Sequence, residues 1–489
     1  MSYIIPIDRN QYRISSLEDI IGKENPVRII DALVEKIVYD NKEYFNKKQN
    51  KTEVGRPEYH PTVMLKLYLY GYFNGINSSR KIEIETKRNV EVNWLIGCLT
   101  PDHWTISMFR KDNSAEIKEM TKRFRHFLKD KHYILGKMVA IDGSKVKANA
   151  SKEFLDEEKI NKHIEELEIN LEEKMEEYLS KMDAMDTAED NIEQKKTELK
   201  LLEKKIKKVK KDLGDYAELN ELRKAKGKNS ISKTDPECNF MKSRNGLIPG
   251  YNVQIISDSK NKMIADSEVT TEANDLNQLE PMIESIKEEL DITPEKVLAD
   301  KGYNKPDMIE KVTKQEGIKC YIPNVETSRD REEIKFTYNE KGDYVECSEG
   351  KKLVLISKNK KKNNSIVNQY RGIECDGCKL REQCTKSPKG RTYYIYANEE
   401  WRKQYRKEMG FKRSVKKHKK RKELVEHIFG NLKMLMGWIP LRLRGKEKVS
   451  IEINLFTTVY NIKRLINIEK EKGLNYLLSI INNYHWKIA

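Results

Sequence analysis

The sequence has no run of about 20 apolar residues, the length that a helix needs to cross a lipid bilayer. Its first residues, Met1-Ser2-Tyr3-Ile4-Ile5-Pro6, also lack the layout of a secretory signal peptide. These two absences argue against a membrane protein and against a secreted one. We therefore expect a soluble, cytoplasmic protein, and a chain of 489 residues is long enough for two or three domains.

Cysteine is scarce, with seven residues in the whole chain, and in a cytosolic protein these suggest thiols or metal ligands before disulfides. Cys375 and Cys378 form a CxxC pair, with Cys347 before it and Cys384 six positions after it. Together they supply four thiolates, the ligand set of a structural Zn²⁺ site, and neighbouring lysines would let such a unit contact DNA. The alternative is four reduced cysteines in a small β-domain that needs no metal.

Basic residues outnumber acidic ones, with 94 Lys and Arg against 78 Asp and Glu and a formal net charge of +16. Such an excess attracts the phosphate backbone of nucleic acids through a salt-dependent term that carries no sequence information. Basic residues are dense between 402 and 422, directly before Glu426. We interpret this segment as a track for phosphates, although a solvated helix face would look similar.

Three acidic residues, far apart in the chain, carry most of the information. Asp142 ends the apolar run Met138-Val139-Ala140-Ile141, and Asp300 ends the run Val297-Leu298-Ala299. Short apolar runs bounded by turn residues predict buried strands, and a carboxylate after such a strand lies at the rim of the sheet. Glu426 lies in a segment that is typical of a helix. Taken singly, Asp142 would more often belong to a turn and Glu426 to a solvated helix face.

Three carboxylates brought together would repel one another unless divalent cations neutralise them. Hard cations such as Mg²⁺ prefer oxygen ligands of this kind. Two such ions, about 3.5–4 Å apart, would activate a water molecule and stabilise the leaving oxygen of a phosphodiester. The acids therefore predict a two-metal nuclease-type site with Mg²⁺ or Mn²⁺.

The N-terminal 133 residues are expected to be helical, with Pro61 opening one helix and Thr105 capping another. Helices that carry Arg80 and Lys81 would fit a DNA groove, as in helix-turn-helix modules. We favour recognition of DNA ends by this region; a dimerisation or packing domain is the alternative.

Between the first two core strands, residues 152–232 repeat apolar residues at spacings of three and four, including Leu171, Met175 and Met182. The repeat pauses near residue 188 and resumes, which predicts a helical hairpin in the form of an antiparallel coiled coil. The first helix is acidic and the second is rich in lysine. A projecting spacer, a dimer contact and a DNA arm all remain open for this insertion.

Alternating apolar residues from Tyr251, the strand before Asp300 and the segment Lys319–Pro323 predict the rest of a mixed α/β sheet. The expected units are a helical domain (1–133), the first core strand (134–151), the coiled-coil insertion (152–232), the continued core (233–330), the cysteine-rich insertion (331–395), the glutamate helix with further core helices (396–470) and a tail helix (471–489).

The order of these motifs is similar to that of a known family. The chain resembles the DDE transposases of bacterial insertion sequences, in the branch with a helical N-terminal domain and a cysteine cluster before the last acid. The motifs that carry the resemblance are Gly55-Arg56-Pro57, Gly71-Tyr72-Phe73-Asn74-Gly75, Pro101-Asp102-His103-Trp104, Ala140-Ile141-Asp142-Gly143-Ser144-Lys145, Gly250-Tyr251-Asn252-Val253-Gln254, Ala299-Asp300-Lys301-Gly302-Tyr303, Glu426-His427-Ile428-Phe429-Gly430-Asn431-Leu432-Lys433, Leu443-Arg444-Gly445 and Tyr460-Asn461-Ile462-Lys463-Arg464.

The resemblance implies a mixed α/β fold with an RNase H-like catalytic core, in which Asp142, Asp300 and Glu426 bind two metal ions. It also implies hydrolysis at the ends of a mobile element and strand transfer into target DNA. Lys433 matches a lysine seven positions after the glutamate. Arg421 precedes Glu426 by five positions, one more than in some relatives, and His418 stands where a tyrosine often occurs.

The implied partners are double-stranded DNA, as terminal inverted repeats and as target, and a second copy of the chain in a homodimer. The protein would then be associated with the nucleoid. The residues that we expect to contact DNA are Lys433, Arg421, Lys301, Arg80 and Lys81. Two other classes compete with this interpretation: a catalytically inactive, transposase-derived DNA-binding protein, and a zinc-dependent interaction protein that uses the core only as a scaffold.

Overall fold

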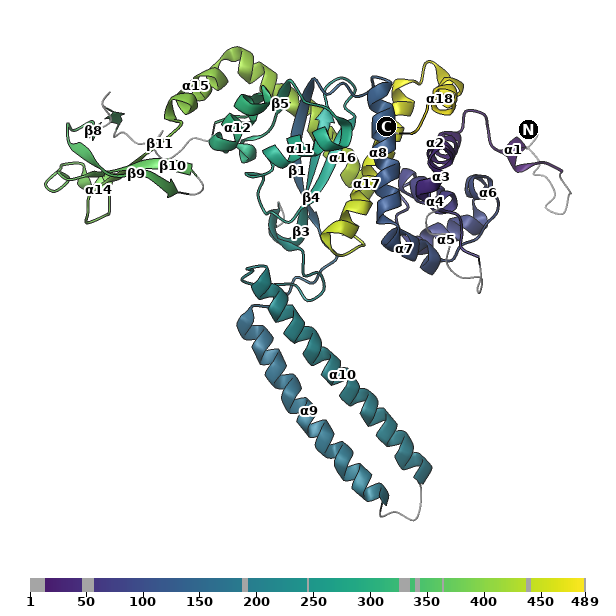
Figure 1. Ribbon diagram of the computed structural model, residues 1–489. Coiled ribbons are helices and arrows are strands. Elements are labelled where there is room, and N and C mark those ends of the chain that lie inside the picture. The colour runs from purple at the N-terminus through teal and green to yellow at the C-terminus, as the bar shows by residue number, and fades with distance from the viewer. Residues whose placement is uncertain are drawn as a thin grey trace, which may run out of the picture.

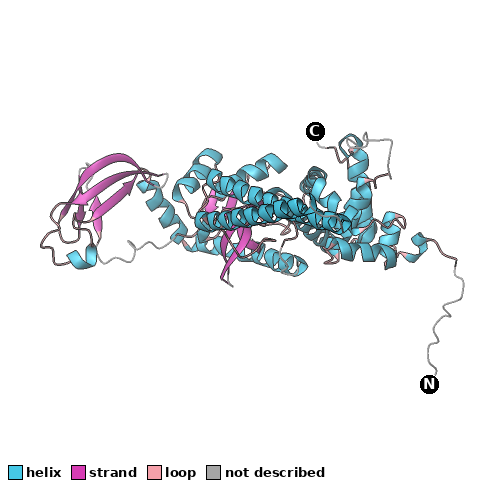
Figure 2. Cartoon of the chain, turned by 90° about the horizontal axis from the view of Figure 1, so that it is seen from below, coloured by secondary structure: helices cyan, strands magenta, loops and turns pink. Residues whose placement is uncertain are grey.

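The computed structural model describes residues 14–45, 57–186, 192–243, 246–324, 335–338, 344–362, 365–436 and 441–487. The first six residues and Gly55-Arg56, discussed above, lie outside these ranges. The chain is a mixed α/β protein with a central sheet flanked by helices and a long helical hairpin that projects from it (Figure 1). A second, smaller sheet lies at the end of the molecule opposite the N-terminal helices (Figure 2).

Helices form the N-terminal part. Their bounds are α1 (Leu17–Ile20), α2 (Val27–Asp40), α3 (Lys42–Phe45), α4 (Pro61–Phe73), α5 (Ser79–Arg88), α6 (Val90–Ile96), α7 (His103–Asp112) and α8 (Ser114–Asp130). Pro61 opens α4, where a missing N–H costs nothing because the first turn has no partner for it. The expectation that Thr105 is a cap is wrong: the side chain of Asp102 caps α7 and accepts a hydrogen bond from the Thr105 N–H at 2.8 Å.

The main sheet combines antiparallel and parallel strands. Its strands are β1 (Met138–Lys147), β2 (Asn239–Ser243), β3 (Gly246–Asp258), β4 (Ile264–Thr270), β5 (Lys296–Leu298) and β6 (Lys319–Tyr321). The order is β2-β3-β1-β5-β6, with β4 also paired to β3. β1 runs antiparallel to β3 and parallel to β5, and β5 runs parallel to β6. The helices α11 (Leu279–Leu290) and α12 (Pro306–Glu316) make the crossovers to the parallel strands.

The central strand β1 is covered on both faces. Val139 and Ile141 belong to the large core, whereas Ala140 points to the other face and packs with Leu298, Leu424 and further residues of a smaller cluster. This alternation follows from the two-residue period of a strand. Two-sided burial explains why the sequence before Asp142 is continuously apolar.

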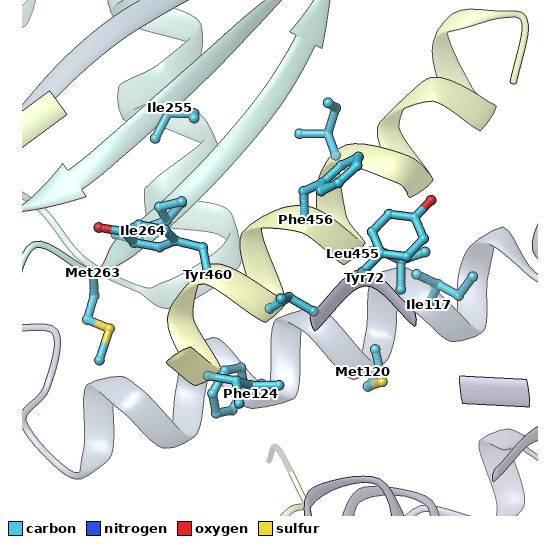
Figure 3. Packing of buried hydrophobic residues seen from close by; sticks show 14 of the residues in the cluster. Tyr72, Ile117, Met120, Phe124, Ile255, Met263, Ile264, Leu455, Phe456 and Tyr460 are labelled. Carbon is cyan, nitrogen blue, oxygen red and sulfur yellow. The ribbon is translucent and has the colours of Figure 1, made fainter. Parts of the chain in front are cut away.

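A buried helix joins the helical part to the sheet. It is α17 (Lys446–Ile468), which follows α15 (Glu399–Gly410) and α16 (Lys412–Met436) and precedes α18 (Gly473–Asn482). Figure 3 shows Leu455 and Phe456 of α17 beside Tyr72 and Ile117 of the N-terminal helices, with Ile255 and Ile264 of the sheet on the other side of the view. The rings of Tyr72 and Phe456 lie 4.5 Å apart between centroids. The N-terminal helices and the sheet therefore share one hydrophobic core.

The segment expected as a hairpin contains two long antiparallel helices, α9 (Glu157–Asp186) and α10 (Ile192–Ala225). The hydroxyl of Tyr178 donates to Glu203 at 2.8 Å, and Arg223 pairs with Glu157 at 2.9 Å. At the base, an isolated bridge between Leu155 and Ile231 closes the hairpin next to the sheet. Figure 1 shows the hairpin extending away from the rest of the chain.

The cysteine-rich segment contains the second sheet. Its elements are β7 (Phe336–Tyr338), β8 (Tyr344–Cys347), β9 (Lys352–Lys362), β10 (Ser365–Gly372), α14 (Arg381–Cys384) and β11 (Thr392–Tyr396). Its own core is small and centres on Val345, Leu353 and Tyr370. Asp307 of α12 ties this unit to the main body by accepting hydrogen bonds from Asn398 at 2.9 Å and from Arg402 at 2.6 Å.

No helix within the described ranges is both long enough and apolar enough to span a membrane.

A buried ion pair links α8 to the sheet. Arg125 donates to Asp266 of β4 at 2.7 Å and to the Ser267 hydroxyl at 2.8 Å, and both members of the ion pair are almost fully buried. Asp266 also accepts hydrogen bonds from Ser285 and from the Ser267 N–H. The charge of Asp266 is thus compensated only through this network.

We expect Arg125→Met to lower the free energy of unfolding by about 3 kcal/mol, because it leaves the Asp266 carboxylate buried without its cation. Urea denaturation followed by circular dichroism measures this change. The matched control is Lys403→Met, which removes a cation from the solvent-exposed pair with Glu400 and should change stability by less than about 0.5 kcal/mol. Equal effects of the two substitutions would contradict the structural role assigned to the buried pair.

Candidate active site

Asp142 and Asp300 lie side by side on neighbouring strands. β1 and β5 are parallel, and Ala140 pairs with Leu298. Asp142 is two residues after Ala140, and Asp300 is two residues after Leu298. Both side chains therefore project from the face of the sheet that bears Ala140 and Leu298. Asp300 also caps the short 3₁₀ helix Lys301–Tyr303 and accepts a hydrogen bond from the Gly302 N–H at 2.7 Å.

The two carboxylates influence each other. Burial raises the pKa of Asp142 to about 6, Arg421 opposes this shift, and the neighbouring Asp300 adds to it. The Gly143 N–H donates to Asp142 at 3.1 Å and stabilises its charged form. A carboxyl group with such a pKa, beside a second carboxylate, is a frequent feature of functional sites.

Helix α16 brings a cation to this pair. Leu424 and Val425 pack against Ala140 and Leu298, which fixes the rotation of the helix. One turn earlier, Arg421 donates to Asp142 at 2.9 Å, and both side chains are mostly buried. The Nε2 atom of His418 lies 3.1 Å from the carbonyl oxygen of Ala299. Burial lowers the pKa of His418, which favours the neutral ring that donates to this carbonyl.

A third acid, Asp275, adjoins the site and was not among the predicted site residues. It precedes α11 and accepts hydrogen bonds from Lys145 at 3.0 Å, Asn252 at 2.7 Å and Gln254 at 2.7 Å. One of its carboxylate oxygens lies close to Gly143, which directly follows Asp142. The other lies close to Gly302, two residues after Asp300. A Cβ atom at Gly143 would come within 2.5 Å of Asp275 and 2.4 Å of the Gln254 amide, so only glycine fits there.

Tyr303 completes this network beneath the two aspartates. Its buried hydroxyl donates to the amide oxygen of Gln254. Burial raises the pKa of Tyr303 well above its ordinary value, and Asp275, Asp142 and Asp300 add to the shift. A detectable signal did exist in the sequence, because Asn252 and Gln254 alternate with apolar residues in a strand that is otherwise buried. Buried amides need partners.

Glu426 is not brought to the two aspartates. It lies on α16 with an exposed side chain. It follows Arg421 by five residues, which is about 140° around a helix, so it does not share the face that meets Asp142. Among the residues with described positions, no group of three His, Cys, Asp or Glu side chains is placed to hold a metal ion. Glu426 therefore stays a prediction as the third ligand.

The residues expected to contact DNA occupy different places. Lys301 directly follows Asp300 and is exposed, and Arg80 and Lys81 are exposed on α5 in the N-terminal helices. The side chain of Lys433 lies outside the described residues. The basic segment before Glu426 forms the first half of α16, with exposed cations at Lys412, Arg413, Lys416, Lys419, Lys420 and Lys422.

The four clustered cysteines all belong to the second sheet. Cys347 ends β8, Cys375 and Cys378 follow β10, and Cys384 ends α14, each with an intermediate exposure. Burial raises the pKa of Cys384, and the other three cysteines add to the shift. Within the described ranges, the four side chains are not placed as a set of metal ligands. Of the remaining thiols, Cys238 and Cys320 are buried and Cys98 is exposed.

Two family models match the chain. The first, described as a transposase domain (DUF772), covers residues 15–112. The second, described as a transposase DDE domain, covers residues 346–466, a range that contains Glu426 and the four clustered cysteines and begins after Asp142 and Asp300. Both matches are to transposase domains. Together they indicate a DDE transposase of an insertion sequence, as the resemblance predicted.

No curated protein matches the chain. Among solved structures, the cryo-EM structure of the piggyBac transposase synaptic complex with hairpin DNA is similar over 95% of this chain and 81% of that chain. The TM-score is 0.31 and the sequence identity is 9%, and a likeness of this size carries no argument about the site.

The electrostatics of Asp142 make stability depend on pH. Its folded-state pKa of about 6 exceeds the value of about 3.9 for an unfolded chain, so folding favours the protonated form. The stabilisation is present below about pH 4 and is lost as the pH rises through about 6. In metal-free buffer we expect wild type to lose on the order of 2 kcal/mol relative to Asp142→Asn between pH 4 and pH 8.

Urea denaturation of both proteins across this pH range measures the difference. The control is Asp215→Asn, which removes an exposed carboxylate from α10 and should keep the same offset from wild type at every pH. A constant offset between wild type and Asp142→Asn would show that the burial of Asp142 does not perturb its titration.

Proposed function

We propose that the chain cuts DNA at the ends of its mobile element and joins those ends to target DNA by two-metal phosphodiester chemistry. The observation that carries this proposal is the placement of Asp142 and Asp300 on adjacent parallel strands, beside each other and mostly buried. The sheet order, with an antiparallel group continued by two parallel strands, suits the RNase H-like core that the resemblance implies.

The two aspartates fit a divalent cation. Their two negative charges lie close together in a mostly buried position, and Arg421 neutralises only one of them. Mg²⁺ or Mn²⁺ would bind their oxygens, and bound ions of this kind supply an activated water and a counter-charge for the leaving oxygen. We assign Glu426 as the third ligand on the strength of the resemblance.

The residues of the chain supply the remaining functions. Asp275 holds the Lys145 ammonium and the amides of Asn252 and Gln254 in place, which keeps the floor of the site rigid around Gly143 and Gly302. The exposed cations of α16, together with Lys301 and Lys433, bind the phosphates next to the cleaved bond. We assign DNA-end recognition to the N-terminal helices that carry Arg80 and Lys81.

Partners and location follow from this chemistry. The protein acts on double-stranded DNA in the nucleoid, first on the terminal inverted repeats and then on the target. Two element ends must be held together during the reaction, and a homodimer provides one site for each end.

Cleavage tests the assignment of the three acids. A labelled DNA fragment that carries the end of the element is incubated with protein and Mg²⁺, with EDTA as the metal-free comparison. We expect nicking at the boundary for wild type, and a loss of at least about a thousandfold for Asp142→Ala, Asp300→Ala and Glu426→Ala, because metal activation contributes several kcal/mol.

Glu423→Ala is the matched control for Glu426→Ala, since Glu423 is an exposed glutamate on the same helix, and its cleavage rate should stay near that of wild type. Full activity of Glu426→Ala would remove Glu426 from the site. Specific binding of the element end by wild type without any cleavage in Mg²⁺ or Mn²⁺ would instead identify an inactive, transposase-derived DNA-binding protein.

We further propose that Cys347, Cys375, Cys378 and Cys384 bind a structural Zn²⁺. The support is their common location in one small sheet and the mutual influence of their thiols on Cys384. The sheet has a hydrophobic core of only a few side chains, and a small core of this kind is often stabilised by a metal. Four thiolates would hold the ion and close its coordination shell.

Metal analysis of protein purified without chelators tests the zinc site. We expect about one Zn²⁺ per wild-type chain, and its loss from Cys378→Ser and Cys384→Ser, because three thiolates bind the ion more weakly than four. Cys98→Ser, which replaces an exposed thiol in the N-terminal helices, should retain the metal. Wild-type protein that contains no zinc would contradict the assignment.

A further inference from the structure

The helical hairpin presents apolar side chains to solvent. Met175, Leu179 and Met182 of α9 are 43%, 57% and 42% exposed, although spacing alone placed both methionines in the seam between the helices. The seam is formed instead by residues such as Ile160, Leu199 and Val209. The three exposed side chains lie three and four residues apart, so they form one stripe along α9.

This stripe borders a groove of about 440 Å³ between the two helices. The lining residues are Met175, Tyr178, Leu179, Glu203, Ile206, Lys207 and Lys210. The lining combines three apolar side chains with the polar Tyr178 and three charged side chains. A hydrophobic centre with a polar rim is the usual composition of a protein–protein interface.

The two borders of this face carry opposite charge. On α9, Glu172 and Glu176 each lie three residues before a member of the stripe, on the side away from α10. On α10, Lys207 and Lys210 line the opposite border, together with Glu203, which accepts a hydrogen bond from the Tyr178 hydroxyl. The helices as a whole show the same bias, with eleven acidic and four basic residues in α9 and seven acidic and eleven basic residues in α10.

We propose that this face of the hairpin binds the same face of a second copy of the chain, with the two hairpins parallel and related by a two-fold axis along their length. When two such faces meet with their hairpins parallel, the left border of one face lies against the right border of the other. The acidic border of each copy then lies against the basic border of its partner. An antiparallel meeting would place like charges together, which is unfavourable.

A second copy fits this face better than DNA does. A DNA backbone would meet the acidic border and the apolar stripe, and only the lysine border would attract it. Burial of the exposed methionines and leucine is most favourable in free energy when another apolar surface covers them. Self-association also supplies the acidic and basic borders in equal number.

The parallel arrangement has a consequence for the sheet. Each hairpin is anchored next to its own main sheet through Leu155 and Ile231 (Figure 1). Parallel hairpins therefore place both sheets at the same end of the assembly, where two DNA ends would be processed together. The inference rests on the homodimer of the proposed function and adds the surface that forms it.

The mass of the protein in solution, measured without DNA, tests the interface. Sedimentation equilibrium should give twice the chain mass for wild type. Met175→Glu/Leu179→Glu should raise the dimer dissociation constant by at least about tenfold, because charges replace the centre of the contact. The control is Ile169→Glu/Leu201→Glu, which alters two apolar side chains of similar exposure that do not line the groove, and it should remain dimeric. Circular dichroism verifies that each variant keeps its helix content.

Charge exchange tests the orientation. Lys207→Glu/Lys210→Glu and Glu172→Lys/Glu176→Lys should each weaken the dimer, and the four substitutions combined should restore it. Dimers that survive Met175→Glu/Leu179→Glu would overturn the hairpin interface while leaving a homodimer intact. A wild-type monomer would overturn both. Charge variants that stay dimeric but lose affinity for DNA would assign the hairpin to DNA and reject the proposal.

Discussion

Repulsion between two neighbouring, mostly buried carboxylates is the constraint around which the centre of this molecule is organised. Asp142 and Asp300 are held together by the pairing of β1 with β5, and burial penalises the charge of Asp142. The surrounding structure offsets part of that penalty. Backbone N–H groups of Gly143 and Gly302 donate to the two side chains, and Arg421 supplies one positive charge. Within the part of the chain that the structure describes, Asp300 has no ion pair, and an uncompensated carboxylate of this kind favours the binding of a divalent ion.

The rest of the fold keeps these strands and α16 in position. α17 is buried along most of its length and packs against the N-terminal helices, the sheet and α16. Buried polar contacts add directionality to this packing. Arg125 joins α8 to β4 at 2.7 Å, and Arg110 joins α7 to α17 through a buried ion pair with Glu452 at 3.4 Å. These contacts have defined geometry, so they fix how the helical part sits on the sheet more tightly than apolar contacts alone.

The features that the sequence predicted well are those with a local physical signal. Apolar runs that lead to a carboxylate predicted the buried strands β1 and β5, because strand burial is recorded in adjacent residues. The expectation that β1 ends at Asp142, on the rim of the sheet, is wrong: the strand continues to Lys147, and Asp142 pairs with Ile255 of β3. The contribution of Asp275 could not be predicted in this way. It lies between β4 and α11, and it reaches the site only because the fold brings Lys145, Asn252 and Gln254 to it. Likewise, a repeat of three and four residues predicts a helix, but it does not decide whether Met175 faces the partner helix or solvent.

The spacing between Arg421 and Glu426 shows how one residue changes the chemistry of a helix face. A glutamate four residues after the arginine would share its face, but that position is Val425, which is buried against Ala140 and Leu298. Glu426 instead shares a face with Lys422, one turn earlier and exposed. On a helix of fixed rotation, Arg421 and Glu426 therefore cannot both face Asp142. The structure forms the Arg421–Asp142 ion pair, and Glu426 would reach the two aspartates only if α16 changed its rotation.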